Sequence, residues 1–75
     1  KLAEAEQRLK LALQLNPKSP EARANLGLAY LYQKKWNVAI GELKTALKMD
    51  PTLVGAQYNL GFAYLQRDKS YQEAI

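Results

Sequence analysis

The 75-residue chain contains no cysteine and no histidine. Without cysteine it can form neither a disulfide nor a thiolate metal site. Without histidine it lacks the commonest metal ligand and the commonest general base. It also has no glycine-rich phosphate loop and no pair of acidic residues placed for acid–base work. The sequence therefore predicts a protein that is not an enzyme and that uses no cofactor or metal.

Long apolar runs are missing as well. Polar residues interrupt every apolar stretch before it reaches the ~18 residues of a membrane span, so we expect no membrane segment. The net charge of +4 is only mildly basic. No targeting segment is visible, so the compartment stays unknown, with the cytoplasm as the default. Because the chain ends within a helical pattern, we expect it to be part of a longer one.

What the chain does contain is an internal repeat. The segment Asn25–Leu31 (NLGLAYL) recurs as Asn59–Leu65 (NLGFAYL), 34 residues later. Pro17 and Pro51 are separated by the same interval. A fixed period of this length is the signature of stacked repeats, in which each unit covers the apolar face of its neighbour. Such a stack works through an extended surface.

Apolar residues recur at intervals of three and four along most of the chain, which predicts helices joined by short turns. The expected helices cover residues 1–15, 20–33, 36–49 and 53–66, and a truncated fifth begins at Ser70. The first and third end before Pro17 and Pro51, because a residue that precedes proline avoids the helical region. Ser19 and Thr52 are the expected N-caps of the second and fourth helices.

Two of these helices differ in how apolar they are. The helix over 20–33 has apolar residues on nearly all sides, so we expect neighbouring helices to cover most of it. The helix over 36–49 carries Glu42, Lys44 and Lys48 together, which predicts a convex, solvated face.

These residues resemble the tetratricopeptide repeat. Within residues 20–53 the positions that match the pattern of this family are Leu26, Gly27, Tyr30, Ala39, Leu43, Ala46 and Pro51. The resemblance implies an all-α fold, a right-handed α-solenoid of antiparallel helix pairs. It implies one complete repeat over 20–53, the second helix of a partial repeat over 1–19, and the first helix with a truncated second helix of a third repeat over 54–75.

The sequence departs from the family pattern at a few positions. The leading aromatic residue is replaced by Arg23 in one repeat and by Gln57 in the next. The small residue usual in the turn between the two helices is Lys34. The third repeat has one extra residue within 67–70, which we interpret as an insertion in a turn.

Two glycines of the repeat, Gly27 and Gly61, have a structural interpretation. A side chain at either position would push apart the two helices of its repeat. We therefore expect close helix packing at both positions and assign them no role in binding.

Members of this family are protein–protein interaction modules that bind a peptide or a helix in a concave groove. The resemblance implies a groove that is apolar and aromatic with a row of amides. The residues expected to line it are Glu21, Ala24, Asn25, Leu28, Leu31, Tyr32, Tyr58, Asn59, Phe62, Leu65 and Gln66. The amides of Asn25 and Asn59 could bind a peptide backbone of any sequence, or could pair within their own repeats.

Other functions stay open at this point. The chain could be a structural spacer whose groove is filled from within the protein, or the substrate-recruiting arm of a larger enzyme. Copies of the chain could also associate head to tail, the first helix of one pairing with the fourth of the next. A nucleic-acid partner is not expected, because the basic residues lie at turns or on the outer helices and the groove carries Glu21. The groove also lacks the lysines and arginines with which a subtype of this family clamps a C-terminal carboxylate.

Overall fold

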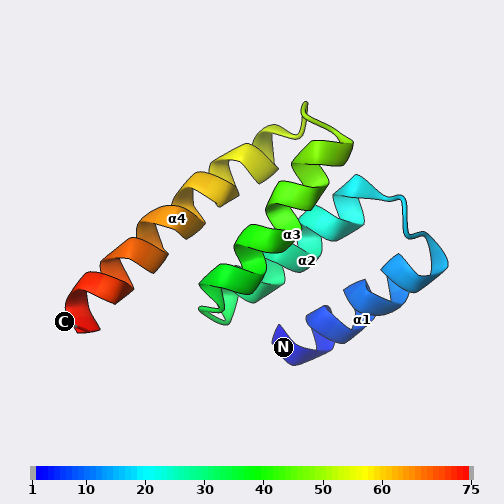
Figure 1. The fold of residues 1–75 in the computed structure, drawn as a ribbon. Coiled ribbons are helices and arrows are strands. Elements are labelled where there is room, and N and C mark those ends of the chain that lie inside the picture. The colour runs from blue at the N-terminus through cyan, green and yellow to red at the C-terminus, as the bar shows by residue number, and fades with distance from the viewer. Residues whose placement is uncertain (1, 75) are drawn as a thin grey trace.

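The structure, a computed structural model, describes residues 2–74 and folds them into four helices (Figure 1). These are α1 (Leu2–Leu15), α2 (Pro20–Tyr32), α3 (Trp36–Met49) and α4 (Val54–Ala74). Helices α2 and α3 form a central antiparallel hairpin, α1 packs on α2, and α4 packs on α3. All regular secondary structure in this part of the chain is helical, which confirms the predicted all-α helical repeat fold.

The turn between α1 and α2 is built as the sequence predicts. Pro17 follows the end of α1, and the hydroxyl of Ser19 accepts a hydrogen bond of 3.1 Å from the backbone N–H of Ala22. Pro20 occupies the first position of α2, where its missing N–H costs nothing. The predicted cap at Ser19 is confirmed.

The turn between α2 and α3 uses a left-handed residue. Lys34 has a φ of 61°, a conformation that glycine adopts more easily. The backbone N–H groups of Lys34 and Lys35 donate to the carbonyls of Leu31 and Tyr30, at 2.9 and 3.0 Å. This pair of bonds closes the end of α2 as a Schellman motif. Lys34, where the family usually has a small residue, is therefore in a strained backbone conformation.

The turn between α3 and α4 differs from the prediction. Thr52 was expected to cap the next helix, but α4 begins only at Val54. The carboxylate of Asp50 instead accepts from the hydroxyl of Thr52 at 2.6 Å and from its backbone N–H at 3.0 Å. These two hydrogen bonds lower the pKa of Asp50 below its ordinary value. Thr52 therefore stabilises the turn and not the helix end.

Helix α4 also differs from the prediction. A turn was expected within 67–70, with a fifth helix from Ser70, but α4 continues without a break to Ala74. The inserted residue therefore lengthens the helix. The residues at 67–70 include no glycine or proline, so nothing in them stops a helix. The hydroxyl of Ser70 accepts from the indole N–H of Trp36 at 3.3 Å, which ties these turns to the start of α3.

The core lies between α2, α3 and α4. Ala39, Leu43 and Ala46 of α3 are fully buried, and so is Ala63 of α4. Leu43 sits against Gly27: a Cβ placed on this glycine would lie 2.8 Å from the Cγ of Leu43. The close approach predicted at Gly27 is therefore confirmed.

Gly61 behaves differently from Gly27. A Cβ placed on Gly61 would meet no heavy atom within 4 Å, so the close packing predicted there is wrong. The reason is that α4 continues straight and does not fold back on itself.

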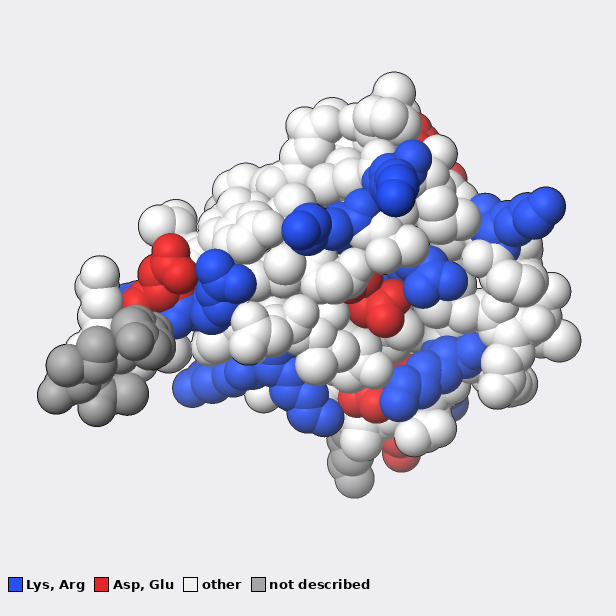
Figure 2. Space-filling model, viewed as in Figure 1, with Lys and Arg blue, Asp and Glu red and all other residues white. Residues whose placement is uncertain are grey.

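The outer face of α3 is solvated only in part. Lys44 and Lys48 are exposed as predicted, but Glu42 is partly buried and pairs with Arg23 of α2 at 3.0 Å. Figure 2 shows the face that α3 presents, with lysine and arginine side chains spread over it and acidic side chains between them.

Candidate functional site

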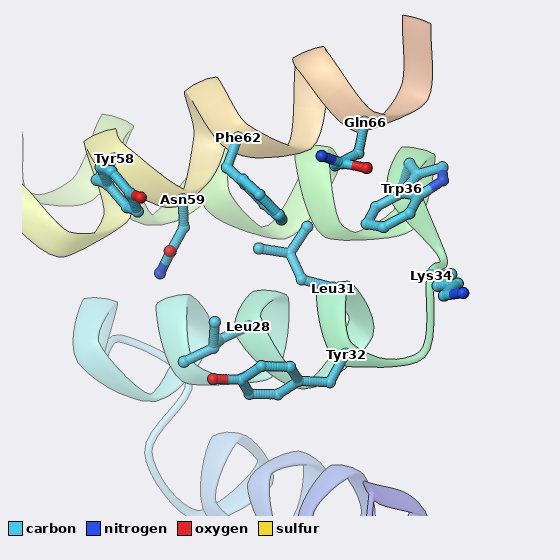
Figure 3. Close-up of a pocket in the computed structure, with 9 residues that line it drawn as sticks. All are labelled: Leu28, Leu31, Tyr32, Lys34, Trp36, Tyr58, Asn59, Phe62 and Gln66. Carbon is cyan, nitrogen blue, oxygen red and sulfur yellow. The ribbon is translucent and has the colours of Figure 1, made fainter. Parts of the chain in front are cut away.

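Helices α2 and α4 line an open groove (Figure 3). It consists of two adjoining hollows of about 480 and 550 Å³, which share Leu28 and Asn59. We call this surface the α2–α4 groove. Its main lining residues are Glu21, Ala24, Asn25, Leu28, Leu31, Tyr32, Lys34, Trp36, Tyr58, Asn59, Phe62 and Gln66.

The helical period explains why these residues share one surface. On α2, Ala24, Leu28 and Leu31 follow one another at intervals of four and three, so their side chains point the same way. On α4, Phe62 and Gln66 are spaced in the same manner. In Figure 3 Phe62 of α4 and Leu31 of α2 point toward one another across the groove.

All the residues that the sequence predicted for the groove line these two hollows, except Leu65. Leu65 lies on another side of α4, where with Gly61 and Gln57 it lines a further hollow of about 370 Å³. Tyr58 and Phe62 lie between the two and line both this hollow and the groove. Because the sequence cannot show how α4 is rotated, it assigned too wide a face of this helix to the groove.

The structure also adds residues that sequence analysis did not select, among them Leu53, Val54 and Ala56 around the start of α4. Lys34 and Trp36 line the groove at the end where α2 turns into α3. The short turn between α2 and α3 could have predicted that these two residues line the groove. A short connection brings the first residue of the next helix back to the end of the previous one.

The groove has an apolar floor and aromatic walls. Leu31 is only 5% exposed and forms part of the floor, and Phe62 lies close above it in Figure 3. Tyr58 and Tyr32 are 75% and 65% exposed on the two sides. Exposed aromatic residues beside an apolar floor are typical of surfaces that bind protein segments.

Two amides lie in the same hollow of the groove. Asn25 of α2 and Asn59 of α4 both line the hollow that also contains Glu21. No hydrogen bond joins either side chain to another described residue. An asparagine amide offers a donor and an acceptor together, which suits a peptide backbone.

The charged side chains of the groove lie at opposite ends. Glu21 is in the first turn of α2, and Lys34 follows its last turn. Since α2 has 13 residues, a rise of ~1.5 Å per residue separates these ends by roughly 20 Å. The groove therefore has an acidic and a basic end, with an apolar and amide-lined middle.

The concave surface extends past α2 toward α1. A hollow of about 420 Å³ between these helices shares Asn25, Leu28 and Tyr32 with the α2–α4 groove, and Ala5 and Leu9 line its other side. Three of the four helices thus contribute to one continuous apolar surface.

Besides the apolar packing of Leu9 and Leu13 against the core, a charged cluster ties α1 to the end of α2. The carboxylate of Glu6 is 2.8 Å from the ammonium of Lys10 and accepts a hydrogen bond of 2.7 Å from the amide of Gln33. These two hydrogen bonds lower the pKa of Glu6 below its ordinary value of 4.5, and Lys35 adds to the effect. The ammonium groups of Lys10 and Lys35 also lie 6.0 and 5.7 Å from the centre of the Tyr30 ring.

The described residues can also be assessed for two further kinds of site, a metal centre and a membrane span. Among these residues no three His, Cys, Asp or Glu side chains are placed to hold a metal ion. None of the described helices combines the length and the apolar character needed to cross a bilayer.

The chain matches a known protein family. A family model described as TPR repeat matches residues 29–67, which is more than half of the chain. The matched segment begins in α2, covers all of α3 and extends into α4. The comparison with curated proteins found no match.

Proposed function

Because the chain belongs to the tetratricopeptide repeat family, we propose that it is a scaffold that binds a peptide or helix of a partner protein in the α2–α4 groove. Repeats of this family generally mediate protein–protein interaction, and the family is typically a non-catalytic scaffold. The observation that carries the proposal for this groove is the set of aromatic side chains, Tyr32, Tyr58 and Phe62, exposed around the buried Leu31.

The groove suits a short segment with apolar side chains. An extended peptide rises ~3.3 Å per residue, so about six residues span the distance between Glu21 and Lys34. Apolar side chains of the ligand would pack against Phe62 and Leu28, where burial of aromatic and aliphatic surface supplies the binding free energy. The amides of Asn25 and Asn59 would pair with its backbone.

The charges at the two ends favour one orientation of the ligand. A basic residue or the amino end of the peptide would lie near Glu21, and an acidic residue near Lys34. Such exposed pairs add little affinity, but they disfavour the reversed orientation, because it would place like charges together.

The test is selection of binding peptides from a displayed random library on the immobilised chain, followed by titration of a labelled selected peptide. Phe62→Asp is expected to weaken binding at least tenfold, because it places a charge in the apolar centre of the groove. Phe62 is 41% exposed, so we expect the variant to remain helical by circular dichroism.

Val38→Asp is the matched control. Val38 is 47% exposed on α3 and outside the α2–α4 groove, so the same substitution there should leave peptide affinity unchanged. The groove is the wrong site if a folded Phe62→Asp variant binds as tightly as the wild type. If no peptide is selected and Phe62→Asp unfolds the chain, the surface is filled from within the protein and the chain is a structural spacer.

A further inference from the structure

We propose that Glu21 determines the specificity of the α2–α4 groove, which selects partner segments that carry a basic residue close to a bulky apolar residue. The basic side chain would pair with Glu21, and the apolar side chain would fill the hollow beside Leu31. This inference rests on the proposed function, because it states which peptides the groove accepts.

The two hollows of the groove lie side by side between helices. α2 forms one wall and α4 the other. The turns on either side of α3 contribute Lys34 at one end and Thr52 at the other. Because Leu28 and Asn59 line both hollows, one extended segment can lie across the two.

The hollows differ in the size of the side chains around them. The hollow of about 480 Å³, which we call the aromatic hollow, has large side chains around it, including Leu28, Leu31, Tyr32, Trp36, Tyr58 and Phe62. The hollow of about 550 Å³, which we call the acidic hollow, has small residues beside its two asparagines, namely Ala24, Gly55 and Ala56. A bulky apolar side chain of the ligand therefore buries more apolar surface in the aromatic hollow, and burial there supplies more binding free energy.

Glu21 gives the acidic hollow its charge. Among the described residues that line this hollow, Glu21 alone is charged. It is exposed and forms no ion pair with a described residue. The carboxylate of Asp50 lies 2.6 Å from the hydroxyl of Thr52, which lines the same hollow, so a second negative charge is near. A lysine or arginine of the ligand is therefore favoured at this end.

Lys34 disfavours a basic residue at the other end. It lines the aromatic hollow and forms no ion pair with a described residue. A ligand whose basic residue lay on this side would bring two positive charges together, and like charges across an interface select against such a partner. The basic residue of the ligand therefore lies on the Glu21 side of its apolar residue.

The length of α2 sets the spacing between these two ligand residues. Leu31 follows Glu21 by ten residues, so a rise of ~1.5 Å per residue separates them by roughly 15 Å. An extended ligand covers this distance in about four to five residues. A long basic side chain can also reach along the groove, which gives a spacing of roughly three to five residues.

The test starts from a displayed library of random decapeptides selected on the immobilised chain. We expect selected peptides to carry lysine or arginine roughly three to five residues from phenylalanine, leucine, tryptophan or methionine. One labelled selected peptide is then titrated against the chain, together with the same peptide in which glutamate replaces the basic residue. The ratio of the two dissociation constants measures the charge preference.

Exchange of the charge at Glu21 is the decisive variant. Glu21→Gln should weaken binding of the basic peptide about twofold to fivefold, the usual range for an exposed charge pair. Glu21→Lys should reverse the preference, so that the glutamate peptide binds more tightly than the basic one. Added salt should reduce the preference of the wild type, because mobile ions screen exposed charges.

Glu4→Lys is the matched control. Glu4 is exposed in the first turn of α1, as Glu21 is in the first turn of α2, so both substitutions change the net charge and the charge at a helix start equally. Glu4 lies outside the groove, so the control should keep the preference for the basic peptide.

The outcomes separate this inference from the proposed function. If selected peptides lose affinity with Phe62→Asp but lack a basic residue at this spacing, the groove binds peptides and the role of Glu21 is overturned. The same holds if Glu21→Lys and Glu4→Lys change the preference equally. If no selected peptide depends on Phe62, both proposals fail. Circular dichroism checks that the variants are folded, and Glu21→Gln decides the outcome if Glu21→Lys is not.

Discussion

The segments Asn25–Leu31 and Asn59–Leu65 have nearly the same sequence but differ in what covers them. In both, the alanine that follows the glycine by two positions is buried, 5% exposed at Ala29 and 0% at Ala63. The leucine at the end of each segment is 5% exposed in the first and 70% exposed in the second. A repeat motif thus encodes a helix and its faces, but each face is buried only where a neighbouring helix lies against it.

The largest effect is expected at the leucine that fills the interface. Leu43→Ala should lower the free energy of unfolding by about 2–5 kcal/mol, because Leu43 is fully buried and truncation leaves a cavity. Leu9→Ala, at the equivalent position of the half-covered α1, should cost clearly less. Urea denaturation followed by circular dichroism at low concentration measures both, and equal losses would contradict the comparison.

The two glycines should respond with opposite signs to the same substitution. At Gly27 the added methyl group would lie 2.8 Å from Leu43, and overpacking of about 1–3 kcal/mol outweighs the gain in helix propensity. At Gly61 there is no contact, so Gly61→Ala should stabilise α4 by up to about 1 kcal/mol. Thermal unfolding of the two variants checks this, and a stabilised Gly27→Ala variant would show that the α2–α3 interface is looser than described.

The turn residues should also respond oppositely. Lys34→Gly should raise the free energy of unfolding by up to about 1 kcal/mol, because glycine adopts the positive φ of this position without strain. The equivalent residue Asp68 lies inside α4, where Asp68→Gly should lower helicity at a cost of about 0.3 kcal/mol, since aspartate is already a poor helix former. Circular dichroism at 222 nm during heating compares them, and a stabilising Asp68→Gly would indicate a hairpin at 67–70.

The smallest effect concerns pH. Glu6 of α1 and Ile40 of α3 occupy equivalent positions of the repeat. At this position α3 places an apolar side chain in the core, whereas α1 has a charged one that pairs with the end of α2. The pKa of Glu6 is lowered from 4.5 in the folded chain, so its contribution to stability is present above that value and is lost as the pH falls through the folded pKa. Glu6→Ile should reduce the acid-induced loss of helicity.

Titration from neutral to acidic pH, followed by circular dichroism, tests this expectation. The pKa of Asp50 is also lowered, but Asp50 is present in both proteins, so the difference between the two curves isolates Glu6. Identical curves would show that the Glu6 cluster does not stabilise α1.

Much of the fold could be predicted from the sequence. The apolar period and the prolines located α1, α2 and α3 closely, and Ser19 marked the start of α2, because these signals are local. All but one of the residues selected from the repeat line the α2–α4 groove, but the repeat did not select Lys34 and Trp36. The predictions that Thr52 caps the fourth helix and that Ser70 starts a fifth helix were wrong. A hydroxyl can bond to several nearby groups, and its sequence position does not decide which.

By itself, the sequence determined the helical period, the turn after each proline and the family of the repeat, since these depend on interactions between residues close in the chain. The tertiary structure decided which side of each helix is covered. Burial of Leu43 against Gly27, exposure of Gly61 and the path of α4 past Ser70 all depend on where other helices lie. Contacts between distant residues set these outcomes, so two nearly identical segments acquire different surroundings.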